Sequence, residues 1–89
     1  MSVINLRIPQ SMDYVGRVVS IVRRAKVTVR TMDVEMKDTA YEVNIQVEGP
    51  ADEIKWLVAK LDKLPEVLEI REIPIQAAAV AAAVTKGNI

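Results

Sequence analysis

The sequence predicts an α+β domain with the ferredoxin-like βαββαβ arrangement, a four-stranded antiparallel sheet with two helices on one face. Two segments, 3–8 and 41–48, alternate apolar with polar residues, which is typical of half-buried strands. Two others, 12–24 and 51–64, repeat apolar residues at helical spacing. Because we expect neighbouring strands to be antiparallel and both crossovers right-handed, the strand order should be 4-1-3-2.

The first strand is predicted over residues 3–8, and the first helix is predicted to begin after Ser11. The residues on one face of this strand are Ile4, Leu6 and Ile8. Pro9 ends the strand because it has no N–H to donate. Ser11 suits the N-cap position of the helix, and Asp13 adds favourable negative charge to its first turn.

The first helix has an apolar face of valines and an opposite face of cations. The valines are Val15, Val18, Val19 and Val22, and the cations are Arg17, Arg23 and Arg24. Valine is a mediocre helix former, so this helix depends on tertiary packing more than on propensity. We therefore expect it to lie on the sheet.

The next two strands form a hairpin, with residues 37–39 as its polar turn. The second strand, predicted over about residues 27–36, changes parity midway. Its first apolar residues are Val27 and Val29, and its later ones are Met32, Val34 and Met36. A bulge near Arg30 or Thr31 would reconcile the two sets. The third strand has the clearest alternation, with Tyr41, Val43, Ile45 and Val47 on one face.

The second helix is predicted to begin near Ala51, after a break at residues 49–50, and to end at Pro65. Its apolar stripe consists of Ile54, Leu57, Val58, Leu61 and Leu64. A fourth strand is predicted over residues 67–73, with Leu68 and Ile70 facing inward.

Trp56 is the least expected residue of the second helix, because it points to the side opposite the apolar stripe. A large exposed aromatic side chain is a candidate anchor for a partner chain. The alternative is that the indole lies over the aliphatic stems of neighbouring lysines, which are Lys55, Lys60 and Lys63.

The chain divides into one domain over residues 1–75 and an alanine-rich C-terminal tail over residues 76–89. Alanine favours helix, but so short a segment is marginal alone in water. The tail is therefore either frayed or partly helical, or it docks the face formed by its alanines and valines on a partner.

The composition excludes several classes of protein. Lysine plus arginine equals aspartate plus glutamate at 12 each, so no net field attracts nucleic acid or anionic lipid. Cysteine and histidine are absent, which removes thiol chemistry, the commonest general base and the usual transition-metal ligands. With no secretory signal and no apolar run of about 20 residues, we expect a cytoplasmic protein without metal, cofactor or membrane contact.

Catalysis and nucleic-acid recognition both lack the residues that they need. The strand glutamates alternate with apolar residues, as on a solvated face, and are Glu42, Glu48, Glu69 and Glu72. RNA readers of this fold stack bases on aromatic side chains of the open sheet face. The matching positions of the first and third strands hold Asn5, Arg7, Glu42, Asn44 and Gln46. We therefore expect neither an enzyme with catalytic residues nor a nucleic-acid-binding protein.

Residues 16–24 and 27–34 resemble the first helix and second strand of an ACT domain. More narrowly, they resemble the small regulatory subunit of acetohydroxyacid synthase (acetolactate synthase) in its short, single-ACT form. The resemblance covers about residues 3–74. It implies a non-catalytic domain that pairs side by side through a sheet edge and its first helix, as a homodimer or higher oligomer. As interface residues we expect Val27, Val29 and Trp56.

The resemblance also implies an effector site between the loop after the first strand and the second strand of a neighbouring copy. The residues at these positions are Gln10, Ser11, Asp13 and Thr28. Amino-acid-sensing relatives carry an asparagine, a glycine and a second asparagine where this chain has Gln10, Asp13 and Thr28. Asp13 therefore adds a negative side chain at the helix N-terminus, where a glycine would let a ligand carboxylate approach.

Three functions remain open from the sequence. The first is a regulatory subunit that binds and activates a larger thiamine-diphosphate-dependent acetohydroxyacid synthase chain in branched-chain amino-acid biosynthesis. The second is a free-standing ACT sensor that binds an amino acid or another small ligand at a dimer interface. The third is a module that regulates some other enzyme. Because a domain of this size buries only roughly 60–65% of its unfolded surface, we expect extra stability from association with another chain.

Overall fold

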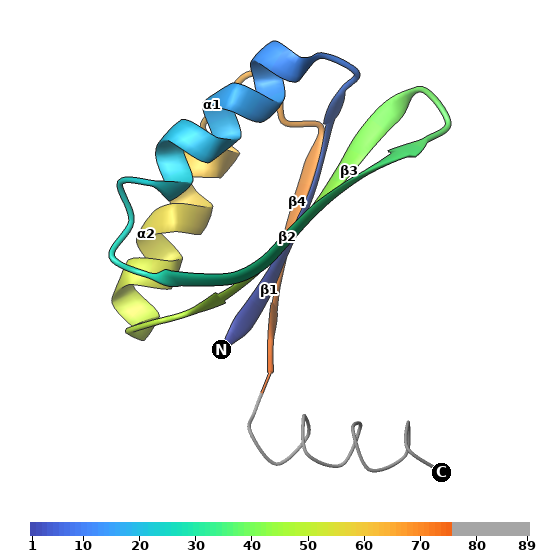
Figure 1. Cartoon of the computed structure of the whole chain (residues 1–89). Coiled ribbons are helices and arrows are strands. Elements are labelled where there is room, and N and C mark those ends of the chain that lie inside the picture. Colours follow the sequence, from blue (N-terminus) through green and yellow to red (C-terminus); the bar gives the residue numbers. More distant parts are fainter. Residues whose placement is uncertain (76–89) are drawn as a thin grey trace, which may run out of the picture.

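The computed structural model describes residues 1–75 of the 89-residue chain. Its elements, in chain order, are β1 (Ser2–Pro9), α1 (Met12–Val22), β2 (Thr28–Lys37), β3 (Ala40–Glu48), α2 (Ala51–Asp62) and β4 (Glu69–Pro74). The strands form one antiparallel sheet in the order β2-β3-β1-β4, with both helices on one face (Figure 1). This confirms the predicted fold and strand order. The tail, residues 76–89, lies outside the described residues, so both alternatives for it stay open.

The core lies between the sheet and the helices and is almost wholly aliphatic. The strands β1 and β3 contribute Ile4, Leu6, Ile8, Val43, Ile45 and Val47, all with no exposed surface. The helices contribute Val15, Val18, Val22, Ile54, Leu57 and Leu61. Since β1 and β3 are the central strands, one face of each is fully covered, and this is why their sequences alternate so clearly.

A bulge keeps the apolar residues of β2 on the helix-facing side of the sheet. The register with β3 shifts between Val29 and Thr31, which leaves Arg30 as the extra residue. Before the shift Val29, and after it Met32, stand opposite buried residues of β3. The bulge predicted near Arg30 or Thr31 is therefore confirmed.

The start of α1 is where the sequence predicted it, but one valine of its apolar face is less buried than predicted. The Ser11 hydroxyl accepts a hydrogen bond from the Asp13 N–H at 3.2 Å, which makes Ser11 the N-cap. Val19, predicted to share the buried face, is 36% exposed. Its side chain lies about 100° around the helix from the buried Val18, which turns it toward the edge of the sheet.

The end of α2 and the start of β4 also differ from the prediction. The helix ends at Asp62, three residues before Pro65, with Lys63 as its C-cap. Leu68, predicted to face inward, is 62% exposed because the paired part of β4 begins only at the next residue. Ile70 stands opposite the buried Leu6, so the inward assignment of Ile70 is confirmed.

Leu57 and Leu68 allow a matched test of the packing, since one is fully buried and the other is 62% exposed. We expect Leu57→Ala to lower the free energy of unfolding by about 2–5 kcal/mol, because it removes buried apolar surface and leaves a cavity. Leu68→Ala should change it by no more than about 0.5 kcal/mol. Urea unfolding followed by circular dichroism measures both values. Equal losses would show that the buried faces are assigned wrongly.

Candidate functional site

The four residues predicted for the effector site lie near opposite ends of the sheet. Gln10, Ser11 and Asp13 follow β1, at the end that carries the β2–β3 turn, whereas Thr28 begins β2 at the other end. At a rise of about 3.3 Å per residue, the ten residues of β2 separate the two groups by roughly 30 Å. One copy of the chain therefore brings Gln10, Ser11 and Asp13 together but not Thr28.

Polar contacts hold the loop after β1 in place. The Gln10 side chain donates from Nε2 to the Asp38 carbonyl oxygen at 3.2 Å, which ties the loop to the β2–β3 turn. The Ser11 carbonyl oxygen accepts from the N–H groups of Tyr14 and Val15, at 3.1 and 3.3 Å. Together with the contact between the Ser11 hydroxyl and Asp13, these bonds occupy most of the N–H groups of the first turn of α1.

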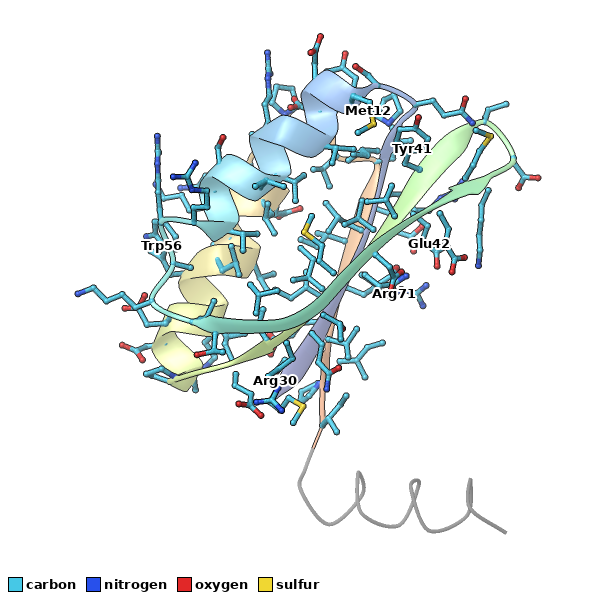
Figure 2. All side chains as sticks on the ribbon, viewed as in Figure 1. Met12, Arg30, Tyr41, Glu42, Trp56 and Arg71 are labelled. Carbon is cyan, nitrogen blue, oxygen red and sulfur yellow. The ribbon has the colours of Figure 1, made fainter. Side chains whose placement is uncertain are left out.

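The three interface candidates differ in their exposure. Val27 is half-buried against the core, and its Cγ1 lies 3.1 Å from where a Cβ on Gly49 would stand. Val29 is 41% exposed on β2. Trp56 is 37% exposed on the helix side of the molecule (Figure 2), and Lys60 Nζ lies 5.8 Å from its ring centre. The indole therefore has a lysine neighbour and still offers surface to a partner.

Exposed apolar side chains of α1 and β2, of which the sequence analysis named only Val29 as an interface residue, are here called the β2 flank. Its members are Met12, Val19, Val29, Val34 and Met36, between 36% and 68% exposed. The residues of β2 in this set face the helix side of the sheet. They remain bare because β2 is an edge strand and the turn end of the hairpin diverges from the helices (Figure 1). Met12 projects from the start of α1 at the same end of the sheet (Figure 2).

The opposite face of the sheet carries a ladder of polar side chains. One row across all four strands consists of Asp33, Asn44, Asn5 and Arg71. Asn5 Nδ2 donates to Asn44 Oδ1 at 2.7 Å, and Asn44 Nδ2 donates to Asp33 Oδ1 at 3.3 Å. Glu42 and Arg71 project on this side, away from the helices (Figure 2). Among residues 1–75 no aromatic side chain stands on this face, as expected from the sequence.

Glu42 belongs to the same ladder, and its pKa is shifted downward. Desolvation opposes ionisation of this carboxyl, but the charge of Lys37 and hydrogen bonds from Asn5, Lys37 and Asn44 outweigh it and lower the pKa. Glu42 Oε1 lies 3.3 Å from Asn5 Nδ2 and 3.5 Å from Lys37 Nζ. Glu42 is therefore an ionised structural group at neutral pH, not one poised for proton transfer.

Residues 1–75 also lack other features of a reactive centre. They hold no cluster of three or more acidic side chains that could bind a metal ion. Every buried side-chain nitrogen or oxygen within this range has a hydrogen-bond partner. None of the described helices is long and apolar enough to cross a membrane.

A comparison with known protein families matches residues 10–70 to the ACT domain. Among solved structures, the ACT domain of the GTP pyrophosphokinase of Chlorobium tepidum is similar, with a TM-score of 0.71 and 16% sequence identity, covering 81% of this chain and 95% of that chain. The ligand-free regulatory subunit of aspartate kinase from Thermus thermophilus gives a TM-score of 0.67 and 15% identity, covering 96% of this chain and 64% of that chain. At such identities the likeness concerns the fold alone. Comparison with curated proteins gives no match.

The lowered pKa of Glu42 predicts how it contributes to stability as the pH changes. A carboxyl whose pKa is lower in the folded state stabilises the fold above its ordinary pKa of about 4.5, and this contribution is lost as the pH falls through the folded-state pKa. We expect an NMR titration of the Glu42 carboxyl to give a pKa below the ordinary value, and Lys37→Gln to raise it. Glu42→Gln should remove this part of the acid dependence of unfolding. A Glu42 pKa at or above the ordinary value would contradict the assignment.

Proposed function

The chain belongs to the ACT domain family, and on that premise we propose that it is a non-catalytic regulatory subunit that works as a side-by-side homodimer. The target that we propose is a thiamine-diphosphate-dependent acetohydroxyacid synthase, which it binds and activates in branched-chain amino-acid biosynthesis. The choice of target rests on the sequence resemblance of residues 16–24 and 27–34 to the small subunit of that enzyme. The observation that supports the homodimer is the exposed apolar surface of the β2 flank, which a second chain would bury.

The shape of β2 supports a two-fold dimer. It is an edge strand of ten residues, and its unpaired N–H and C=O groups can accept a further strand. Two β2 strands joined antiparallel along this edge would place Thr28 of one copy near Lys37 of the other, and hence near the loop that carries Gln10 and Ser11. The pairing would therefore assemble the effector site that one copy leaves divided.

The chemistry of the described residues supports regulation by binding. The sequence has no cysteine or histidine, and the carboxyl with a shifted pKa, Glu42, is held ionised by Lys37 and Asn5. Such a chain can act on a reaction only through the surfaces that it presents to other molecules.

A free-standing ACT sensor that binds an amino acid is the alternative, and the effector site that the proposed dimer would form between the Gln10 loop and Thr28 favours it. The charge of Asp13 weighs against a ligand carboxylate at the start of α1. Two unit negative charges about 4 Å apart repel by roughly 1–4 kcal/mol at effective dielectric constants of about 80 to 20. We therefore expect calorimetry to show weak or no binding of valine, and Asp13→Gly to strengthen it. Micromolar valine binding to the unmodified protein would favour the sensor instead.

The dimer can be tested with two exposed apolar residues. We expect sedimentation at micromolar concentration to show a dimer or larger species. Met36→Glu should give a folded monomer, because Met36 is 67% exposed in one copy and the new charge would be buried in the dimer. The matched control is Leu68→Glu, at a residue that is 62% exposed but lies on β4's side of the sheet. If the unmodified chain sediments as a monomer, both the proposed dimer and the effector site shared between two copies are wrong.

Direct measurement tests the choice of enzyme. The purified chain should co-elute with the acetohydroxyacid synthase catalytic subunit encoded by the same genome and raise its specific activity. The readout is acetohydroxyacid formation with and without the chain at saturating thiamine diphosphate. If the chain neither co-elutes with the catalytic subunit nor activates it, this target is excluded. The proposed dimer is then still tested by sedimentation.

A further inference from the structure

We propose that a shallow groove along α1 binds an acidic, partly apolar segment of the enzyme that this chain regulates. The proposal rests on the regulatory role given above, but not on which enzyme is the target. The groove has a volume of about 520 Å³ and is lined by α1 residues between Asp13 and Ile21, by Arg24 just beyond the end of α1, and by Leu64, which follows α2.

The groove lies on the side of α1 away from the β2 flank. At about 100° per residue, Arg17 and Ile21 lie on one side of the buried Val18, and Val19 lies on the other. An ion pair between Arg17 and Glu66, 3.2 Å apart, joins the groove side of α1 to the connection between α2 and β4. A second copy on the β2 flank would therefore leave the groove open to a different partner.

Gly16 forms part of the groove floor and has no packing role within the chain. A Cβ built on Gly16 would meet no other atom within 4 Å, and its φ is not positive. Glycine is a poor helix former, so nothing in the fold favours it at this position. One turn further on, the Ser20 hydroxyl donates to the Gly16 carbonyl oxygen at 2.9 Å and so stays close to the helix. The floor therefore admits close approach by the backbone of a partner.

The rim of the groove is basic. The guanidinium of Arg17 is positioned by the nearly buried carboxylate of Glu66 and lies 6.0 Å from the ring centre of Tyr14. Arg23 and Arg24 have no carboxylate within ion-pair distance among the residues that the structure describes. Both line a second hollow that continues the groove past Ser20. Because the chain as a whole has no net charge, this local excess of cations favours an acidic occupant.

The form of the groove favours a peptide segment over a small metabolite. The α1 residues of the lining run from Asp13 to Ile21, which is about 12 Å of helix, and Arg24 extends the groove beyond the end of α1. This length exceeds that of an amino acid. Ile21 and Leu64 provide an apolar wall for aliphatic side chains. The open sheet face is a weaker candidate, since its amides and several of its charges bond to one another.

The absence of cysteine makes site-specific cross-linking practical. Ser20→Cys introduces a single thiol in the groove, and Arg71→Cys introduces one on the open sheet face as the control. Each full-length variant, labelled with a benzophenone maleimide, is irradiated in an extract of its own cells, and the cross-linked peptides are sequenced by mass spectrometry. We expect Ser20→Cys to capture a segment of an enzyme that is rich in aspartate and glutamate, and Arg71→Cys to give little of that product.

Two further changes, made in the Ser20→Cys chain, test separately the contribution of the rim cations and that of the open space at Gly16. Arg23→Gln combined with Arg24→Gln removes rim cations and should reduce the cross-linking yield several-fold, as should added salt. Gly16→Gln fills the floor and should abolish the cross-link. Since a Cβ at position 16 would stand in open space and glutamine is the better helix former, this variant should melt at a higher temperature than its parent. Loss of the product therefore cannot be ascribed to unfolding.

The outcomes distinguish the groove from the proposed target. Four outcomes would overturn the proposal that the groove binds an acidic segment. They are capture of only a second copy of this chain, capture of a segment without acidic residues, equal capture from Arg71→Cys, and no capture. An acidic segment from an enzyme other than acetohydroxyacid synthase would support the groove and remove the proposed target. Capture of acetohydroxyacid synthase through Arg71→Cys alone would retain the target and overturn the groove.

Discussion

The packing of the valine face of α1 on the central strands is the interaction on which the rest of this structure depends. Val15, Val18 and Val22 are buried in a core that consists of aliphatic side chains of β1, β3 and the two helices, and valine supplies little helix propensity of its own. The Ser11 cap fixes where the helix begins, and the buried valines fix how it is rotated. That rotation decides the two flanks of α1. One flank lies beside the bare inner side of β2, and the other forms the groove with its cationic rim.

The two faces of the β2–β3 hairpin differ in how their side chains are satisfied, and this difference bears on function. On the open face, amides and carboxylates bond across strands, from Asp33 through Asn44 to Asn5, so this face is complete within one chain. The inner face of β2 carries valine and methionine but extends past the helices (Figure 1). Apolar surface of this kind is stabilised by burial against a second chain. The hairpin therefore supports a dimer that uses the edge and inner face of β2, with the open face outside the contact.

The proposed regulatory role assigns a different partner to each of two surfaces, the β2 flank and the groove along α1. In the proposed assembly, the β2 flank pairs two copies, and that pairing joins Thr28 of one copy to the Gln10 loop of the other. In the same proposal, the groove on the far flank of α1 receives the regulated enzyme. A ligand at the loop would contact the start of the same helix whose later turns line the groove. This gives effector and enzyme one rigid element in common, through which binding at one site can influence the other.

The sequence alone determined what depends on local periodicity and side-chain chemistry. The order of elements, the Ser11 cap, the bulge at Arg30 and the aromatic-free open face all follow from residues a few positions apart. Only the tertiary structure decided which apolar residues are covered, because coverage depends on elements distant in sequence. Val19 and Leu68 carry the same local signal as their buried neighbours yet remain exposed at the ends and edges of the packed layers. For the same reason the sequence could suggest the effector residues, but only the folded sheet places Thr28 too far from Gln10 for one copy to form the site.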